Sequence, residues 1–459
     1  MSNAKKLGVA GLGVVLAGAA LAGVALLALR EPAPTPDVVL IVLDTVRSDY
    51  LSLCGADRPT SPNLEAFAQT AEWTCGAVAP GSWTLPSHAS FFTGMTPLEH
   101  GAHEITSGVK DFSGSASRSR PLKKKGGHPT LAQQLGQRGY HTVAISGNPV
   151  VSKTMGLTRG FDETTIAEKF GRLAEDDLVD AVSAALTGAP TDEPLFLFVN
   201  IAEAHQRWEQ VPDDVDWVSP GDRALLKYAK LSETDPWREY VEGELSEDDR
   251  AAFDADIDSL YAYNTWRADQ TLGRVLALLE DGERCGEGCR IIVTSDHGEM
   301  LGEHGLLDHG HYVWESNVRV PLLVRGASLP DGPINALHAF HLARDGVLPE
   351  TLTPPIAMAW PHVRRCYMTR GEAFCSTSAA LWDGSDKLVW TQDTREAEGR
   401  MMRFDLSVDP DETTPLPVAG HPRLDELLAL VEAVKADAGE EDEVDQSVTE
   451  ALRAAGYLE

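Results

Sequence analysis

The stretch Val38-Val39-Leu40-Ile41-Val42-Leu43, followed directly by Asp44, decides the fold class of this chain. Its apolar, mostly β-branched side chains do not alternate with polar ones, which predicts a strand that is buried on both faces. Strands of this kind lie in the middle of parallel sheets that are covered by helices on both sides. Asp44 would then stand at the carboxyl end of a central strand.

Three further apolar runs predict buried strands, and amphipathic segments between them predict helices. The strands are expected at residues 142–145, 195–200 and 290–294. The helices are expected at residues 61–71, 87–93, 130–138, 173–186 and 255–279. This alternation predicts an α/β fold with a large central, mostly parallel sheet flanked by helices. Ligands of such sheets bind beyond the carboxyl ends of the strands.

The pattern of predicted strands and helices divides this chain into a larger and a smaller folded part. Residues 37–330 carry the alternation of strands and helices and predict the main α/β domain, with a polar insertion at 213–250. Residues 331–459 predict a smaller C-terminal α+β subdomain with short antiparallel strands. Its strands are expected at 379–382, 387–392 and 401–406, and its helices at 423–438 and 447–455.

The first 30 residues predict an N-terminal membrane helix. Lys5 and Lys6 precede an uncharged, apolar run over residues 7–29, which is long enough to span a bilayer as a helix. The run is either a retained transmembrane anchor, which we favour, or a cleaved signal segment. Residues 31–36 form a Pro-rich linker after it. The rest of the chain is therefore expected to be membrane-anchored on the periplasmic or extracellular side, or secreted if the segment is cut.

The charge balance excludes nucleic acid as a partner. The 459 residues carry 39 Lys and Arg against 70 Asp and Glu, a formal net charge of −31, so the surface repels polyanions. With 43% hydrophobic and 24% charged residues, the composition is that of a globular protein. An anionic substrate must therefore be held locally, by metal, histidine or backbone donors.

The six cysteines fit structural disulfides in an oxidising compartment. Several pairings are possible for six cysteines. Proximity along the chain favours Cys54 with Cys75, Cys285 with Cys289, and Cys366 with Cys375. A cysteine metal site is the weaker interpretation, because the spacing of zinc-binding motifs is missing from the sequence.

Four polar residues near predicted strand and helix ends suggest a reactive centre. Asp44, Asp296 and His297 follow two predicted strands and offer oxygen and nitrogen ligands to one divalent cation, with Mn, Ca, Zn and Mg as candidates. Thr84 precedes Pro86, a residue suited to the first turn of a helix, so its hydroxyl would lie where an anion binds. Taken singly, an Asp here could cap a helix and the Thr could be a turn residue. Together they predict a threonine activated by a metal.

Several longer segments, which include these residues, give the chain a resemblance to a known family. It resembles the sulfatase family within the alkaline-phosphatase superfamily over about residues 36–416. The segments that carry the resemblance are VVLIVLDTVRSDYLS at 38–52, SPNLEAFA at 61–68, TLPSHASFFTGMTPLEHG at 84–101, TLAQQLGQRGYHTVAISGN at 130–148, VTSDHGEMLGEHGLLDHGHYVWESNVRVPLLVRG at 293–326, and FDLSVDPDETTPL at 404–416.

The resemblance implies an alkaline-phosphatase-like fold with residues 37–330 as the catalytic domain. It also implies roles for single residues. Asp44, Asp296 and His297 would be metal ligands, and Thr84 would be both the fourth ligand and the covalent nucleophile. The histidines expected to act on the substrate are His205 and His309, which would contact the transferred group, and His88, which shares with His309 the role of protonating the leaving oxygen.

The departures from the family pattern are as informative as the matches. Sulfatases have Cys or Ser, matured to formylglycine, at the position of Thr84, and Arg at the position of His88. A cation is replaced by Met95, a lysine-containing segment by Ser146-Gly147-Asn148, and an aspartate by Thr45. The chain thus resembles the threonine-nucleophile branches of the superfamily. Its visible ligands suffice for one metal ion, and a second metal is doubtful.

The sequence therefore predicts an exported, metal-dependent hydrolase of phosphate-type esters, with sulfate esters as the other option. It would act through a covalent Thr84 intermediate. The alternatives are a membrane-anchored phosphoglycerol or phosphoethanolamine transferase and an inactive relative that only binds ligands. The expected partners are an anionic ester, in the form of a small molecule, a lipid head group or a glycan, and the membrane through the N-terminal helix.

Overall fold

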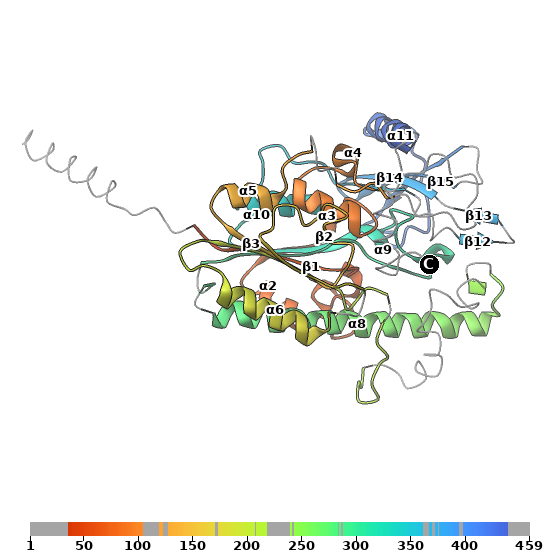
Figure 1. Cartoon of the computed structure of the whole chain (residues 1–459). Coiled ribbons are helices and arrows are strands. Elements are labelled where there is room, and N and C mark those ends of the chain that lie inside the picture. Colours follow the sequence, from red (N-terminus) through yellow and green to blue (C-terminus); the bar gives the residue numbers. More distant parts are fainter. Residues whose placement is uncertain are drawn as a thin grey trace, which may run out of the picture. The chain divides into compact units, whose positions relative to one another are not determined.

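The computed structural model describes most of the chain after residue 34. The described residues are 35–103, 119–122, 127–169, 173–206, 208–217, 239–240, 243–282, 284–285, 288–360, 367–369, 372–374, 376–393 and 398–438. Residues from Asp37 onward form one compact unit (Figure 1). The predicted membrane helix at 1–30 lies outside the described residues. Within them, no helix combines the length and apolar character that crossing a bilayer requires.

A large eight-stranded sheet forms the centre of this unit, in the order β10-β2-β9-β6-β1-β5-β3-β4. Its strands are β1 (Val38–Leu43), β2 (Glu72–Val78), β3 (His141–Ser146), β4 (Glu163–Ile166), β5 (Leu195–Ile201), β6 (Arg290–Ser295), β9 (Arg319–Arg325) and β10 (Ile334–Asn335). The four buried strands predicted from the sequence are confirmed as β1, β3, β5 and β6.

One strand makes the sheet mixed, although the sequence predicted a mostly parallel one. β9 runs antiparallel to both of its neighbours, β2 and β6, whereas the other pairs are parallel. The sequence did not reveal β9 because Pro321 lies inside it, and proline usually argues against a central strand. A register shift between Thr74 and Ala77 similarly interrupts the pattern of β2.

Helices cover both faces of the sheet, as the unbroken apolar run of β1 predicts. Val38, Leu40 and Val42 belong to a core shared with α3, α5 and α10, and the intervening residues of β1 belong to a second core with α2, α6 and α8 (Figure 1). The helices have these bounds: α2 Pro62–Ala68, α3 Thr84–Thr93, α4 Pro97–His100, α5 Leu131–Gln137, α6 Glu175–Gly188, α8 Glu247–Asp281, α9 Glu315–Val318, α10 Ala339–Asp345 and α11 Leu424–Ala438.

Two helices begin earlier than the sequence indicated. α3 starts at Thr84, because Pro86 occupies the first turn, where its missing N–H is not needed. α8 starts at Glu247, where the hydroxyl of Ser246 accepts a hydrogen bond from the N–H of Asp249 at 3.1 Å. The end of the predicted insertion at 213–250 is therefore helical.

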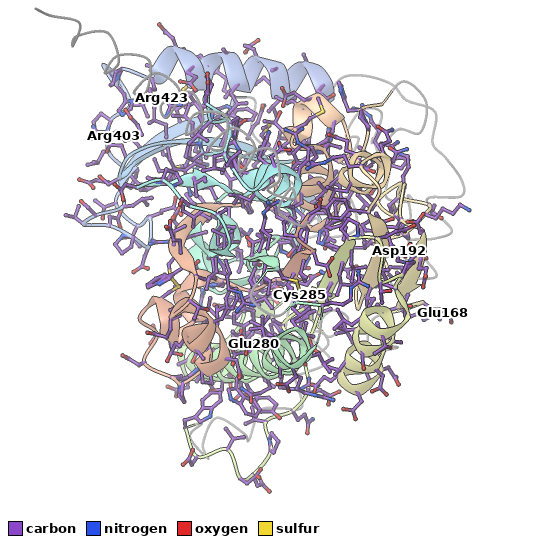
Figure 2. The ribbon with its side chains drawn as sticks, turned by 90° about the vertical axis from the view of Figure 1, so that its left-hand side faces the viewer. Glu168, Asp192, Glu280, Cys285, Arg403 and Arg423 are labelled. Atoms are coloured by element: carbon purple, nitrogen blue, oxygen red, sulfur yellow. A yellow bond between two sulfur atoms is a disulfide. The ribbon has the colours of Figure 1, made fainter. Side chains whose placement is uncertain are left out.

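The C-terminal part contains a second, antiparallel sheet in the order β11-β14-β15-β16. Its strands are β11 (Ile356–Ala359), β14 (Ser376–Asp383), β15 (Asp386–Asp393) and β16 (Arg400–Asp405). α11 packs on it through Leu427, Val431 and Val434, which confirms the predicted α+β character. Figure 2 shows Arg403 and Arg423 of this part far from Glu280 near the end of α8. The helix predicted at 447–455 lies outside the described residues.

A buried lysine joins this second sheet to the segment after β8 (Leu307–Asp308), which pairs with β7 (Met300–Leu301). Lys387 on β15 is fully buried and donates to the backbone oxygen of Val313 at 2.7 Å. Its ammonium also lies 3.0 Å from the carboxylate of Glu315 and 2.7 Å from that of Glu412. The C-terminal sheet therefore supports the polypeptide just beyond His309.

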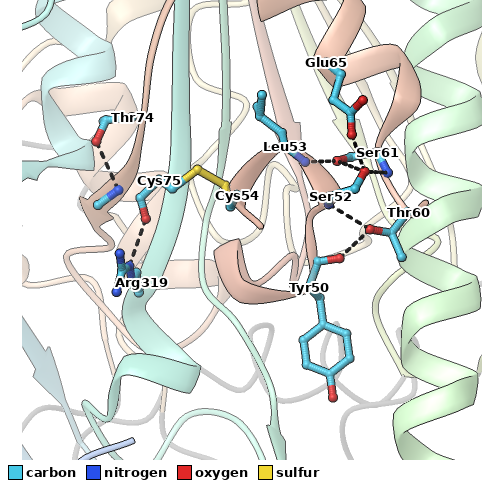
Figure 3. Close-up of a disulfide and its surroundings, with 11 residues drawn as sticks. Tyr50, Ser52, Leu53, Cys54, Thr60, Ser61, Glu65, Thr74, Cys75 and Arg319 are labelled. Atoms are coloured by element: carbon cyan, nitrogen blue, oxygen red, sulfur yellow. Dashed lines mark hydrogen bonds between the residues drawn. A yellow bond between two sulfur atoms is a disulfide. The ribbon is translucent and has the colours of Figure 1, made fainter. Parts of the chain in front are cut away.

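Two of the three predicted disulfides are present. Cys54 pairs with Cys75 and ties the short 3₁₀ turn η2 (Ser52–Cys54) to β2 (Figure 3). Cys285 pairs with Cys289 between α8 and β6. In Figure 3 the backbone oxygen of Cys75 also accepts a hydrogen bond from Arg319 on β9, at 2.9 Å. Cys366 and Cys375 lie outside the described residues.

The two disulfides should differ in their contribution to stability. The Cys54–Cys75 bond spans 21 residues and the Cys285–Cys289 bond spans 4, and a longer loop gains more conformational entropy when it is opened. Replacing both cysteines by serine should lower the free energy of unfolding by about 3 kcal/mol for the first pair and about 2 kcal/mol for the second. Urea unfolding of the two double variants measures this difference. Equal losses would contradict it.

Candidate active site

The register of the large sheet brings four strand ends together. Leu43 at the end of β1 lies beside Ser295 of β6 and Ile201 of β5, so Asp44 and Asp296 leave the sheet as neighbours. On the other side of β5, Ser146 at the end of β3 lies beside Asn200. The carboxyl ends of parallel strands meet at one edge, where these polar side chains converge.

The turn after β1 fixes both carboxylates. Thr45 adopts φ 63°, an uncommon conformation for a β-branched residue. In this conformation its N–H donates to Oδ1 of Asp296 at 3.0 Å, and its hydroxyl donates to Oδ1 of Asp44 at 2.9 Å. The hydroxyl of Tyr261 on α8 donates to the Thr45 backbone oxygen at 2.5 Å. Thr45 therefore holds the two carboxylates in place.

Asp44, Asp296 and His297 form a compact cluster suited to a metal ion. Their candidate ligand atoms all lie within 4.8 Å of one another, and the three residues are fully buried. Among the described residues, Oδ2 of Asp296 has no hydrogen-bond partner, a costly state for a buried carboxylate oxygen. Bound by carboxylates and an imidazole, a divalent cation would satisfy this atom.

The ring of His297 is oriented for ligation. Its Nδ1 lies 2.8 Å from the backbone oxygen of Gly298, so Nδ1 carries the proton that is donated there. Its Nε2 faces Oδ2 of Asp296 at 3.4 Å and Oγ1 of Thr84 at 3.5 Å. A histidine that donates from one nitrogen presents the lone pair of the other to a metal, which is the usual arrangement around bound cations.

The pKa values of the two carboxylates are shifted in opposite directions. Burial and then the charge of Asp44 raise the pKa of Asp296 well above its usual value. Burial would also raise the pKa of Asp44, but the neighbouring histidines, His205 first, and the hydrogen bond from Asn148 outweigh it, and this pKa is lowered. A cation beside both groups would favour the ionised form of each.

Thr84 places its hydroxyl beside this cluster. It is the first residue of α3 and is fully buried. The side-chain N–H₂ of Asn148 donates to Oγ1 of Thr84 at 3.1 Å and to Oδ2 of Asp44 at 2.7 Å. The Asn148 carbonyl accepts from the N–H of Val150 at 2.9 Å, which fixes the orientation of the amide. One side chain thus positions the hydroxyl against the carboxylate.

His88 lies one turn further along α3 and is neutral at physiological pH. Burial lowers its pKa to about 4. Its Nδ1 lies 3.0 Å from the backbone oxygen of Thr84, and its Nε2 lies 3.4 Å from the side-chain nitrogen of Asn200. Its Nδ1 also lies 3.4 Å from Oδ2 of Asp296, so the ring connects the first turn of α3 to the cluster, and its role in protonating a leaving group stays a prediction.

His205 and His309 lie next to the cluster. The ring of His309 is 4.4 Å from that of His297 and 5.2 Å from that of His205, measured between centroids. Glu299, a fully buried carboxylate, places both oxygens 3.2 Å from Nδ1 of His309. Glu299 therefore fixes the orientation of the ring and keeps its Nδ1 protonated.

Glu299, Asp308 and His309 also meet the spacing of a metal site. Both carboxylates lie 3.2 Å from Nδ1 of His309, which they can share as a hydrogen-bond donor. These carboxylates therefore have a hydrogen-bond donor within the protein, whereas Oδ2 of Asp296 has none among the described residues. The prediction of one metal ion thus stays with the first cluster.

Three residues of the site were not assigned a role from the sequence. Asn200 stands at the end of an apolar run, and Glu299 follows Asp296 by three positions, so the same strand-end reasoning could have found both. Asn148 was noticed only as a departure from a family pattern. Its contact with both Asp44 and Thr84 depends on how β3 is ordered in the sheet.

The chain is similar to known proteins in sequence and in fold. A family model described as Sulfatase matches residues 36–336. Over 265 residues the chain is 27% identical to the uncharacterized sulfatase YidJ of Escherichia coli (strain K12), a match that covers 53% of this chain and 43% of that protein. The chain thus spans less than half the length of this curated relative.

Solved structures share the fold at low sequence identity. BT4656, solved in complex with its substrate D-glucosamine-2-N,6-O-disulfate, superimposes with a TM-score of 0.59 at 15% identity, over 90% of this chain and 99% of that chain. The phosphonate monoester hydrolase of Agrobacterium radiobacter gives 0.58 at 18% identity, over 88% and 96%. These likenesses establish an alkaline-phosphatase-like α/β fold.

Metal binding by the cluster can be tested through stability. A divalent cation that binds only the folded chain should add about 2.7 kcal/mol to the free energy of unfolding at a free concentration 100 times its Kd. Thermal unfolding with Mn²⁺, Ca²⁺, Zn²⁺ or Mg²⁺, together with calorimetric titration, should identify the preferred ion and one site per chain. Asp296→Asn should remove the gain.

The matched control for this experiment is Asp308→Asn, which alters the other acidic group near His309. This variant should keep the stabilisation by metal, because Asp308 is not part of the cluster of Asp44, Asp296 and His297. If Asp308→Asn removed the stabilisation and Asp296→Asn kept it, the ion would belong to the other cluster and the prediction would be wrong.

Proposed function

The chain belongs to the sulfatase family of ester hydrolases, and we propose that it cleaves phosphate-type esters through a covalent intermediate on Thr84. The observation that carries this proposal is the position of the Thr84 hydroxyl, bridged by Asn148 to Asp44 and facing His297. Enzymes of the family use a divalent metal, and the cluster of Asp44, Asp296 and His297 is suited to hold one.

The choice of phosphate over sulfate follows from the side chains around Thr84. Threonine cannot be matured to formylglycine, and the positions of two family cations hold the neutral His88 and Met95. A site with few fixed positive charges suits a group with a single negative charge, so among phosphate-type esters it favours a phosphodiester over a dianionic phosphate monoester. The neighbouring fold of the phosphonate monoester hydrolase supports this class, while the sulfated substrate of BT4656 keeps sulfate esters as the second candidate.

In the proposed reaction, each residue of the site has its own role. A divalent cation bound there would supply Lewis-acid chemistry, which lowers the pKa of the Thr84 hydroxyl and draws charge from an ester oxygen. Oγ1 of Thr84 attacks as its alkoxide, the form in which water later releases it, and forms a bond to phosphorus as the bond to the alcohol oxygen breaks on the opposite side. Asn148 holds the hydroxyl for this attack, and the position of Thr84 at the head of α3 lets backbone N–H groups face the anion.

Departure of the alcohol requires a proton. His309, oriented by Glu299, is the proposed donor to the leaving oxygen, and His205 is the second candidate. Water then attacks the phosphothreonine, and the same histidine takes a proton from it. An acceptor alcohol in place of water would complete a transfer, as in the predicted alternative.

We also propose that the protein acts outside the cytoplasm. The two disulfides support this location, because such bonds persist in oxidising compartments. The predicted N-terminal anchor or signal segment would deliver it there.

Replacing Thr84 tests the covalent mechanism. Thr84→Ala should reduce kcat on an aryl phosphodiester by at least about 10³-fold, because no other group supplies the nucleophile, whereas Thr84→Ser should keep a measurable rate. Release of the chromogenic alcohol gives the rate, and intact-mass analysis of rapidly quenched wild-type reactions should detect the phosphorylated chain.

The matched control is Thr93→Ala at the other end of α3, where the hydroxyl donates only to the backbone oxygen of Ala89. It should retain kcat. If Thr84→Ala were as active as this control, Thr84 would be excluded as the nucleophile. If the metal-loaded wild-type protein cleaved no ester, this would instead support the alternative that the protein is an inactive relative that only binds ligands.

Glu299→Gln tests the proposed orientation of His309. The amide keeps the shape of the side chain but can present its N–H₂ to Nδ1, so the ring loses its fixed proton position. We expect kcat to fall by about 10²-fold, the typical worth of a general acid. Steady-state kinetics of this variant, compared with Glu280→Gln on the exposed end of α8, measures the effect. An unchanged kcat would remove His309 as the donor.

A further inference from the structure

A pocket of about 350 Å³ lies beside the candidate active site. It is bounded by Gly147 after β3, by the first turn of α6, by the segment after β5 and by Arg267 of α8. Two of its lining residues belong to the site or adjoin it: His205 is one of the two histidines next to the metal cluster, and Gly147 precedes Asn148. The pocket is therefore placed to receive the part of a substrate that is not transferred.

The described lining of the pocket is acidic. It contains four carboxylates, Glu175, Asp176, Glu203 and Glu209, and one guanidinium, Arg267. Arg267 bonds Glu175, and Asp176 is paired with Arg274 at 2.7 Å. Among the described residues, Glu203 and Glu209 form no ion pair. The described lining thus has more carboxylates than cations.

Glu203 is the carboxylate of this lining whose negative charge the described surroundings stabilise least. Its Oε1 accepts a hydrogen bond from the hydroxyl of Thr271 at 2.9 Å, whereas Oε2 is buried and has no hydrogen-bond partner among the described residues. Burial and then the charge of Glu175 raise the pKa of Glu203 to about 7. A buried carboxylate oxygen of this kind is stabilised by a donor that brings its own positive charge.

The N-terminal dipole of α6 does not make the pocket positively charged. A helix N-terminus attracts anions through its N–H groups and dipole. In α6, however, Glu175, Asp176 and Asp177 occupy the first turn and offset that charge. An anionic leaving group would therefore find little attraction here, whereas a cationic one would find several carboxylates.

We propose that this pocket binds the departing alcohol of the substrate and selects alcohols that carry a protonated amine, such as amino alcohols and amino sugars. Glu203 and Glu209 hold the ammonium, and His205 lies at the border between this group and the ester that Thr84 attacks. The inference rests on the proposed function, since it assigns the leaving group of that same reaction.

Matched pairs of phosphodiesters test this selectivity. The first pair is methyl 2-aminoethyl phosphate and methyl 2-hydroxyethyl phosphate, and the second is the methyl phosphodiesters at the 6-position of glucosamine and of glucose. The full, metal-loaded chain is assayed for release of each alcohol by chromatography. We expect kcat/KM to be roughly tenfold higher for the amine of at least one pair, and the preferred pair then distinguishes an amino alcohol from an amino sugar.

Variants assign the preference to the pocket. Glu203→Gln keeps the hydrogen bond with Thr271 but removes the charge, and should bring the ratio of the two kcat/KM values close to one. Glu209→Gln, at an exposed position that tolerates substitution, should lower the ratio as well and does not depend on the folding of the first variant. Asp177→Asn, in the same turn of α6 but not lining the pocket, should leave the ratio unchanged.

The outcomes separate this inference from the function on which it rests. Equal kcat/KM values within both pairs, with bis(p-nitrophenyl) phosphate still hydrolysed, would overturn the inference and leave the proposed function intact. A preference that survives both glutamine variants would also overturn it. If the wild-type chain hydrolyses no ester at all, the proposed function fails, and the inference fails with it.

Discussion

Two buried carboxylates, Asp44 and Asp296, stand at the ends of neighbouring parallel strands, and their repulsion is the constraint on which the site depends. The protein opposes it with the N–H and hydroxyl of Thr45 and the amides of Asn148 and Asn200, but one oxygen of Asp296 stays without a donor among the described residues. A divalent cation is the simplest partner for such a pair, because it offsets the desolvation and the mutual repulsion at once.

The elements around this pair place a hydroxyl, a helix end and a histidine beside the two carboxylates. α3 begins at Thr84, so a hydroxyl and the N-terminal end of a helix face the same point as the metal cluster. The segment that carries Glu299 and His309 closes the other side. Lys387, buried among Glu315, Glu412 and the Val313 carbonyl, anchors the continuation of that segment to the second sheet. The described C-terminal part thereby supports the geometry of the candidate site, while the three residues of the metal cluster come from the larger sheet.

Charge is distributed in a way that fits an anion held at one point on an acidic protein. The net charge of −31 repels an anionic ester in general, so the proposed binding would come from the cluster, the helix end and nearby histidines. The pocket beside His205 is lined by carboxylates, so it would attract a leaving group with an amine and repel the anionic ester. The two halves of a zwitterionic substrate would then be recognised by adjacent sites of opposite character.

The sequence by itself determined the α/β class, the buried strands, the C-terminal antiparallel sheet, two of the disulfide pairs and the place of Asp44, Asp296 and His297 at the strand ends. These features follow from patterns within short segments, since apolar runs, polar strand ends and chain proximity are local properties. The antiparallel direction of β9, the bridging amide of Asn148 and the contact of Glu299 with His309 were decided only by the tertiary structure. Each depends on which distant segments become neighbours, and strand order in a sheet is set by the packing of both faces rather than by any one stretch of residues.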